Sequence, residues 1–342
     1  MRSNFQTELE DDMISEHQLN SSNSSFGLEG PAPSYMSEIC KNAKGITRLH
    51  YEIYDYVTNV LMPSDQDRIK RKKTVEIINS LVKNFRKDLW IIPYGSYAQE
   101  LDLKSSDIDI AVFNMKITNG IDSEDTLTPL YEYFKQSEKF YPDIQLIYAK
   151  VPIIKGRVKN TDISVDICVN NTQAVYIAET IKGNIKHEPL LQYTIILLKK
   201  ILKNYQLNEA YRGGMSSFML FEMVFFFFQK KILTLESQID LNLGNFLIDF
   251  LDYYANKFDN RTMGISVLNG GKTYKKNGRF AHNLKSDYLS VESCLNIQVD
   301  LGRYCNYPEI KNMFHTIHKE LTFNVRDNCV SFLKEIGLTE HS

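Results

Sequence analysis

The stretch "IIPYGSYAQELDLKSSDIDIAVF", from Ile91 to Phe113, decides the fold of the chain. Its final apolar run contains two aspartates, Asp107 and Asp109, which are separated by one residue. Burying an unpaired carboxylate is costly, so packing alone does not favour this pair. Side chains of a strand alternate between its two faces. The run therefore predicts that both acids project from one face, while Ile108 and its apolar neighbours pack on the other.

Two carboxylates held this close repel each other unless a cation lies between them. Mg²⁺ and Mn²⁺ suit such a position, because both ions prefer carboxylate and phosphate oxygens. A second acidic segment, "DISVDICV" at 162–169, places Asp162 and Asp166 on one face in the same way. Either acid could complete a triad, and Asp166 is the better candidate because it lies deeper in the apolar strand.

A Gly-Ser pair precedes the acids by about a dozen residues. Gly95 follows a predicted strand, and its missing side chain lets the backbone approach a ligand closely. Ser96 opens a predicted short helix, and the first turn of a helix favours phosphate. An isolated Asp-x-Asp is usually a surface pair, and an isolated Gly-Ser is usually a turn. Here both lie in order around apolar strands, so together they predict a site for a metal-bound triphosphate.

The 342 residues suffice for two domains. Residues 1–42 are polar and are predicted to be disordered. A helix at 43–66 is expected to pack with the second domain. Residues 67–175 predict an α+β domain with a small sheet, and 176–338 predict a mostly helical domain. The apolar run "FMLFEMVFFFF" at 218–228 is too short to cross a bilayer and predicts a buried helix, so no membrane association is expected.

The formal net charge of -2 provides no overall electrostatic attraction for nucleic acid. Binding of RNA must then come from a local patch or from a partner. Two short basic segments, 68–73 and 272–279, are more typical of a solvated face than of a specific RNA site. The five cysteines form no Cys-x-x-Cys, which argues against a disulfide framework and against a zinc site.

The order of Gly-Ser, Asp-x-Asp and a later Asp resembles the DNA polymerase beta-like nucleotidyltransferases. The segment "LLKKILKNYQLNEAYRGGMSSFMLFEMV" at 197–224 is similar to noncanonical poly(A) and poly(U) polymerases. The segments 242–258, 264–274 and 301–305 resemble the subgroup of the nuclear TRAMP complex. This resemblance implies a nucleotidyltransferase palm domain, with a small mixed sheet and helices, followed by a mostly helical central, PAP-associated domain.

The resemblance also implies roles for particular residues. The metal-binding and catalytic acids fall on Asp107, Asp109 and Asp166, of which Asp166 would ligate the metal nearer the primer. Lysines on one helix face and a serine would hold the triphosphate, and an aromatic ring would stack on the base. The implied nucleotide-binding residues are Gly95, Ser96, Ala174, Lys199, Lys203, Ser217, Phe218, Asp300 and Arg303.

Two departures from the family bear on the choice of base. The family usually has Tyr where this chain has Phe218, and its adenylating subgroup tends to have an Asn pair where this chain has Val299 and Asp300. A carboxylate only accepts hydrogen bonds, so Asp300 would favour the amino group of adenine over the O4 acceptor of uracil. Alternatively, Asp300 pairs with Arg303 or faces solvent.

The implied activity is template-independent addition of AMP from ATP to a single-stranded RNA 3′ end, with two Mg²⁺ or Mn²⁺ ions. For the resembling subgroup, a zinc-knuckle RNA-binding protein and an RNA helicase are the expected partners. The expected compartment is the nucleus, with the cytoplasm as the alternative. A terminal uridylyltransferase and a catalytically inactive scaffold are the alternative functions. A scaffold would be expected to lose the acids or the lysines, and all of them are present.

Overall fold

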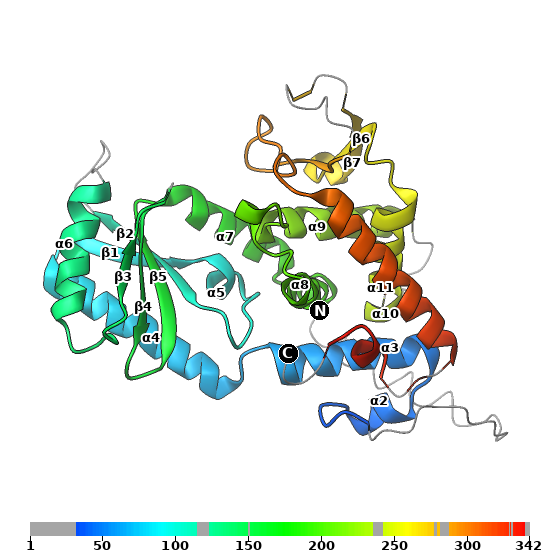
Figure 1. Ribbon diagram of the computed structural model, residues 1–342, viewed down its shortest axis with the longest axis horizontal. Helices are drawn as coiled ribbons and strands as arrows, with labels where there is room; N and C mark the ends of the chain where they lie inside the picture. The colour runs from blue at the N-terminus through cyan, green and yellow to red at the C-terminus, as the bar shows by residue number, and fades with distance from the viewer. Residues whose placement is uncertain are drawn as a thin grey trace.

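The computed structural model describes residues 32–114, 123–149, 151–234, 242–276, 279–280, 287–327, 329 and 331–338. The molecule has two parts side by side, one built on a sheet and one built mainly from helices (Figure 1). The predicted α+β class is confirmed.

The sheet part contains a mixed sheet that helices cover on both faces (Figure 1). Its strands are β1 (Leu89–Tyr94), β2 (Ile108–Asn114), β3 (Gln145–Ile147), β4 (Ile153–Val158) and β5 (Ile163–Val169), and its helices are α4 (Asp65–Phe85), α5 (Gly95–Gln99), α6 (Ser123–Gln136) and α7 (Thr172–Ile185). The strand order is β1-β2-β5-β4-β3, in which β2 and β5 are parallel and the other neighbours are antiparallel.

The alternation predicted for β2 is confirmed. Ile108, Ile110 and Val112 are buried against α4 and α6. On the opposite face, Ala111 and Phe113 pack with the first turn of α7. Because Asp109 lies between Ile108 and Ile110, it faces the α7 side of the sheet.

The helical part has one continuous apolar core. Its elements are α3 (Gly45–Tyr56) with a π-helical turn η1 (Val57–Leu61), α8 (Pro189–Asn204), η2 (Ala210–Arg212), α9 (Ser217–Thr234), α10 (Leu243–Asp252) with η4 (Tyr253–Lys257), η5 (Leu268–Gly270), α11 (Tyr307–Asp327) and α12 (Phe332–Glu335). The helix α3 packs against α10 and α8. Within the described ranges, no helix is both long and apolar enough to cross a membrane.

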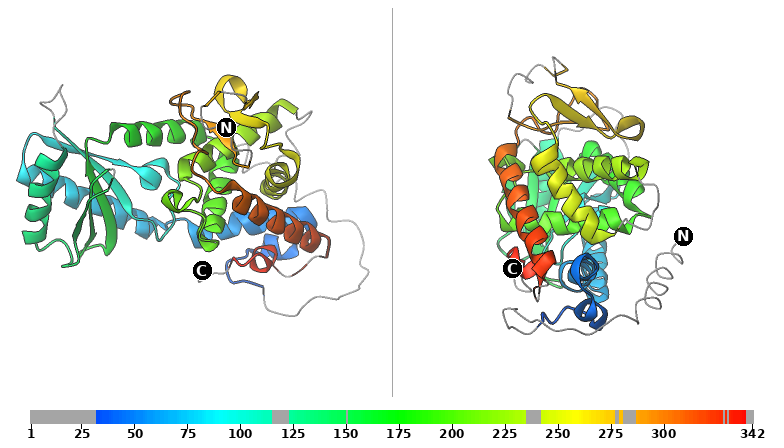
Figure 2. Two further views of the ribbon diagram at one scale, coloured as in Figure 1. Left: turned by 45° about the horizontal axis from the view of Figure 1, so that its top comes forward. Right: turned by 90° about the vertical axis from the view of Figure 1, so that its right-hand side faces the viewer.

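A small three-stranded sheet lies at one end of the helical part, next to α9 (Figures 1 and 2). Its strands are β6 (Met263–Ser266), β7 (Lys272–Lys275) and β8 (Ser290–Glu292), in the order β7-β6-β8. β6 and β7 form an antiparallel hairpin whose turn contains Gly270 and Gly271, and both glycines have the positive φ that their turn requires.

The prediction of disorder up to residue 42 is wrong for residues 32–42, whereas residues 1–31 lie outside the described ranges. The helix α2 (Glu38–Asn42) begins at the cap residue Ser37, whose hydroxyl accepts a hydrogen bond from the Cys40 amide. Tyr35, Met36 and Cys40 are buried in the core of the helical part. These few apolar side chains are anchored by polar contacts to α3, which composition does not reveal.

Candidate active site

The acids predicted as a triad lie in a row across the sheet. Asp109 of β2 is paired in register with Tyr94 of β1 on one side and with Asp166 of β5 on the other. Asp166 is paired in turn with Lys155 of β4. Asp107 lies just before β2 begins. The parallel pairing of β2 with β5 therefore brings together acids that are far apart in the sequence.

The electrostatics of the row favour binding of a cation. Burial, together with the nearby Asp107 and Asp166 carboxylates, raises the pKa of Asp109 to about 7. The pKa of Asp166 is also raised, by burial and by Asp107, although Lys155 acts in the opposite direction. Like charges placed on directly opposite strand positions destabilise a sheet. A cation that reached these oxygens would relieve both effects.

Lys155 is a member of the site that the sequence did not reveal. Its Nζ lies 3.0 Å from Oδ1 of Asp166 and 3.5 Å from Oδ2 of Asp107. It also donates a hydrogen bond to Oδ2 of Asp166, at 3.1 Å. Lys155 matches no motif, and only the register of β4 against β5 places it here.

The donor set fits a divalent ion. Three carboxylates are the oxygen ligands that Mg²⁺ and Mn²⁺ prefer. Oδ1 of Asp166 is buried, and its polar contact within the described part of the chain is the ammonium of Lys155, at 3.0 Å. Over the same described residues, no three acidic, His or Cys side chains converge as a ready-made metal site. Instead, the ammonium of Lys155 lies between the carboxylates of Asp107 and Asp166.

Gly95 is required by its contact with Asp109. A Cβ atom at Gly95 would lie 2.0 Å from Oδ2 of Asp109, and the residue has a φ of +62°. Any side chain here would therefore clash with the acid and strain the backbone. Ser96 follows in the first turn of α5 and is half-buried. The close approach predicted for Gly95 is thus an approach to a residue of the candidate site.

The two lysines of α8 both point toward the segment 101–106, which connects α5 to β2. Lys199 Nζ donates to the carbonyl of Leu101 at 2.8 Å, and Lys203 Nζ donates to the hydroxyl of Ser105 at 3.3 Å. Burial lowers the pKa of Lys199 to about 8, although Asp102 and Asp109 oppose this effect. The i, i+4 spacing accordingly brings both ammonium groups to one segment beside Asp107, and their contact with a triphosphate stays a prediction.

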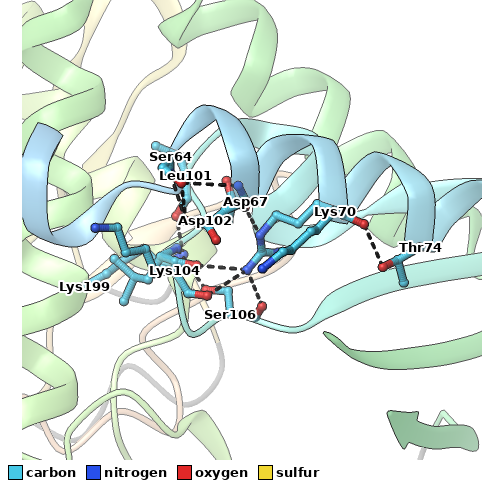
Figure 3. A network of polar contacts seen from close by, with 11 residues as sticks. Ser64, Asp67, Lys70, Thr74, Leu101, Asp102, Lys104, Ser106 and Lys199 are labelled. Atoms are coloured by element: carbon cyan, nitrogen blue, oxygen red, sulfur yellow. Dashed lines mark hydrogen bonds and ion pairs between the residues drawn. The ribbon is translucent and has the colours of Figure 1, made fainter. Parts of the chain in front are cut away.

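Figure 3 shows the polar network around this segment, with Leu101, Asp102, Lys104 and Ser106 labelled. Arg71 of α4 fixes the same segment from the other side. Its guanidinium is buried, lies 3.3 Å from Asp102 and donates to the carbonyls of Leu103, Lys104 and Ser106. Arg71 belongs to the basic run at 68–73 that the sequence assigned to a solvated face. That assignment is wrong for Arg71, because the turn of the helix directs this one side chain inward.

A cavity of about 360 Å³ lies between the two parts of the molecule. From the sheet part, Asp107 and Lys155 line it, and from the helical part Lys199, Lys203 and Ser217 line it. Four of the predicted site residues thus meet at one cavity. Asn208 and Glu209 also line it, and neither residue belongs to a motif that the sequence analysis recognised.

Ala174 and Phe218 are not among the residues that line this cavity. Ala174 lies in the first turn of α7, where its amide donates to the side chain of Asn171. Phe218 lies in the first turn of α9, and its ring stacks on Phe221 with 6.4 Å between centroids. Phe218 is half-buried, so stacking on a base stays a prediction.

Asp300 and Arg303 do not line the cavity either. The buried carboxylate of Asp300 accepts hydrogen bonds from the amides of Val291 and Gly302, both at 2.9 Å, and from the Ser290 hydroxyl at 2.6 Å. The guanidinium of Arg303 lies over the ring of Tyr304. Asp300 therefore fixes the turn after β8, and its part in choosing a base stays a prediction.

Two family models match the chain. The model described as "Poly(A) RNA polymerase, mitochondrial-like, central palm domain" matches residues 49–183. The model described as "Cid1 family poly A polymerase" matches residues 242–297. The first of these ranges contains the sheet part and all three acids, and the second begins with α10.

Curated relatives carry related names. Poly(A) RNA polymerase CID14 of Cryptococcus neoformans is 28% identical over 241 residues, which are 70% of this chain and 31% of that protein. Poly(A) RNA polymerase protein 1 of Eremothecium gossypii is 29% identical over 71% of this chain and 39% of its own length. The chain thus spans about a third of the length of these relatives. Trf4-2 of Drosophila melanogaster, which is named as inactive, is 29% identical over 75% of this chain and 63% of its own length.

Solved structures share the fold. The polymerase core of TRAMP, described as an RNA surveillance complex, matches with a TM-score of 0.74 and 24% identity, over 90% of this chain and 95% of that one. The GTP-bound Cid1 poly(U) polymerase matches with a TM-score of 0.67 and 21% identity, over 80% and 94% of the two chains. Because the two family models match in this order and together span more than half of the chain, it belongs to the noncanonical poly(A) RNA polymerases.

Proposed function

We propose that the chain transfers nucleotides from a nucleoside triphosphate to the 3′ end of RNA without a template. One observation carries this proposal: Asp107 meets Lys199, Lys203 and Ser217 of the helical part at a single cavity. Asp109 and Asp166 do not line that cavity, but they are paired with each other on the adjoining strands. The names of the relatives and of the solved structures support the same class of reaction.

The chain's own residues have separate tasks in this reaction. Lys199, Lys203 and Ser217 neutralise and orient the triphosphate at the cavity. Asp107, Asp109 and Asp166 would hold two Mg²⁺ or Mn²⁺ ions, which when bound stabilise the attacking and the leaving oxygens. Ser96 contacts phosphate, and Phe218 offers a stacking face for the base.

ATP is the proposed nucleotide, because the curated relatives are named poly(A) polymerases. UTP is the alternative, since one of the matching structures is named a poly(U) polymerase. Stacking on Phe218 cannot choose between them, because every base has a stacking face. The inactive Drosophila relative raises the third possibility of a scaffold. The presence of Asp107, Asp109 and Asp166 in one row favours an enzyme over a scaffold.

Delivery of RNA is proposed to depend on partners. The chain has a net charge of -2, so a general attraction for the phosphate backbone is missing. The similarity to the core of a complex, TRAMP, supports partners that bring the RNA. By the family resemblance, we propose a zinc-knuckle protein and an RNA helicase for this role, in the nucleus.

The test incubates the purified chain with a labelled oligoribonucleotide, Mg²⁺ or Mn²⁺, and each of the four nucleoside triphosphates separately. Extension with ATP is expected, and the Asp109→Asn variant serves as the inactive control. Extension by UTP alone would replace the adenylyl proposal with the uridylyl one. A folded wild-type chain that extends no RNA under any of these conditions, with or without added partners, would refute the proposal.

A further inference from the structure

Lys155 occupies an unusual position in the row of acids. β4 pairs with β5 so that Lys155 lies directly opposite Asp166. Its ammonium is 3.0 Å and 3.1 Å from the two carboxylate oxygens of Asp166 and 3.5 Å from Oδ2 of Asp107. The ammonium of a single lysine thus contacts the two carboxylates that a divalent ion would be expected to share.

No second cation performs this task within the described residues. Lys155 alone is in ion-pair contact with Asp107 or Asp166 there. Lys199 acts on Asp109, but its Nζ donates to the carbonyl of Leu101. The ammonium of Lys155 is therefore the direct counter-charge for these two acids while no divalent ion is bound.

The Lys155 side chain has space into which it can move. It is 47% exposed, and it lines the cavity together with Lys203 and Ser217. A lysine carries its charge on a flexible stem of four carbons, so its ammonium can move by several ångströms without a change in the backbone. An ion pair of this exposure is weak enough to exchange.

We propose that Lys155 is an internal counter-ion that takes the place of the divalent ion in the metal-free site, and that an ion binding between Asp107 and Asp166 displaces its ammonium into the cavity. The inference rests on the proposed function, because it takes these acids as the metal ligands. Its consequence is a site whose acids stay together before the metal arrives, at the expense of metal affinity.

The first test measures the displacement directly. The full chain is treated with an amine-reactive acylating reagent in EDTA and in MnCl2, without nucleotide or RNA, and acylation at each lysine is quantified by peptide mass spectrometry. Lys155 is expected to react severalfold faster with Mn²⁺, because its ion pairs are released. The exposed Lys139 and Lys159 are the controls and should not change. Bound Mn²⁺ is measured in the same sample by electron paramagnetic resonance. Unchanged or slower acylation of Lys155 in a chain that binds Mn²⁺ would overturn the inference.

The second test compares Lys155→Met with Arg157→Met. Arg157 lies two residues along the same strand, pairs at 3.1 Å with the exposed Asp162 and is the matched control. Lys155→Met is expected to bind Mn²⁺ about fivefold more tightly and to have a lower Tm in EDTA but not in saturating Mn²⁺. Arg157→Met should change neither the affinity for Mn²⁺ nor the difference between the Tm values in EDTA and in saturating Mn²⁺. If Lys155 only holds β4 against β5, its loss would lower Tm equally in both conditions and leave Mn²⁺ affinity unchanged, which would refute the inference.

These readouts separate the inference from the proposed function. Neither test requires RNA or a nucleotide. A chain that binds Mn²⁺ with the expected release of Lys155 but extends no RNA would refute the proposed function alone. A chain that does not bind Mn²⁺ at all would overturn the assignment of the ligands and the inference with it, and the extension assay would then decide the function by itself.

Discussion

In the helical part, the buried carboxylate of Glu52 accepts four hydrogen bonds from the chain itself, whereas in the sheet part Asp109 and Asp166 face each other as neighbours. The donors to Glu52 are the Tyr35 and Ser331 hydroxyls and the amides of Phe332 and Leu333. Asp107 and Asp166 of the sheet part have Lys155 as their direct ion-pair partner among the described residues. A structural acid is thus supplied with donors by the fold, while a functional acid is left for a cation.

The largest expected effect concerns Asp109. Asp109→Asn should reduce RNA extension about a thousandfold or more, because charge stabilisation at the reacting phosphate is lost. The unfolding free energy of the metal-free protein should stay equal or rise, since a buried and repelled carboxylate is removed. Extension assays check the loss of activity, and urea unfolding checks the unfolding free energy. A variant that loses activity only because it unfolds would remove the contrast with Glu52.

Glu52 should show the reverse pattern. Glu52→Gln places an amide N–H group among four donors, and the expected loss is about 3 kcal/mol of unfolding free energy. Extension per folded molecule should stay near the wild-type value at low temperature. The exposed Glu38, which pairs with Lys41, provides the control, and Glu38→Gln should cost almost nothing. A loss of activity in folded Glu52→Gln would contradict the division between structural and functional acids.

Glu222 lies between these two cases, because it is a buried acid with only one of its two carboxylate oxygens hydrogen-bonded. One oxygen accepts from the Cys294 amide at 2.8 Å, and the other has no hydrogen bond within the described residues. Burial raises the pKa of Glu222 to about 6, from an ordinary value of 4.5. The folded state then binds the proton more tightly than the unfolded state does. Its contribution to stability is complete below about pH 4.5 and is lost as the pH rises through about 6, a change of about 2 kcal/mol. Urea unfolding of wild type and Glu222→Gln between pH 4 and pH 7 measures this difference, and parallel curves for the two proteins would contradict it.

The smallest effect is expected at Asp162. This acid pairs with Arg157 at 3.1 Å, its side chain is 64% exposed, and it has a positive φ that asparagine also tolerates. Asp162→Asn should change the unfolding free energy by no more than about 0.5 kcal/mol and extension by less than about twofold. Asp166→Asn should lose most of the extension activity. If the two variants changed places in the extension assay, Asp162 would replace Asp166 as the third acid.

The sequence predicted the features that depend on local alternation. The apolar and acidic faces of β2 and β5 follow from a period of two, which grouped Asp107 with Asp109 and Asp162 with Asp166; the choice of Asp166 also drew on its depth in the strand and on the family resemblance. It did not predict β4, because "IIKGRV" contains a glycine and two cations. Gly156 is suited to this strand because Phe140 and Ile144 approach within 3.0 Å of the position a Cβ would occupy. Without β4, Lys155 could not be placed in the site.

Arg71 and Tyr35 show a second limit of sequence-based prediction. Arg71 lies in a basic run that was assigned to a solvated face, and Tyr35 lies in a polar segment that was predicted to be disordered. Arg71 is buried by carbonyl groups more than thirty residues away, and Tyr35 is held by Glu52. A polar side chain that is buried through its long-range partners leaves no periodic pattern in its own segment.

The bonds from Glu52 to Ser331, Phe332 and Leu333 have a consequence for the synthesis of the protein. They join residues that are 279 to 281 positions apart, so the core around α3 cannot be completed until the chain up to Leu333 has left the ribosome. The sheet part, by contrast, lies within one continuous segment from α4 to α7. Domains that are contiguous in sequence can fold as they emerge. The half of the site that carries the acids is therefore expected to form first and to wait, with Lys155 beside its carboxylates, for the half that carries the lysines.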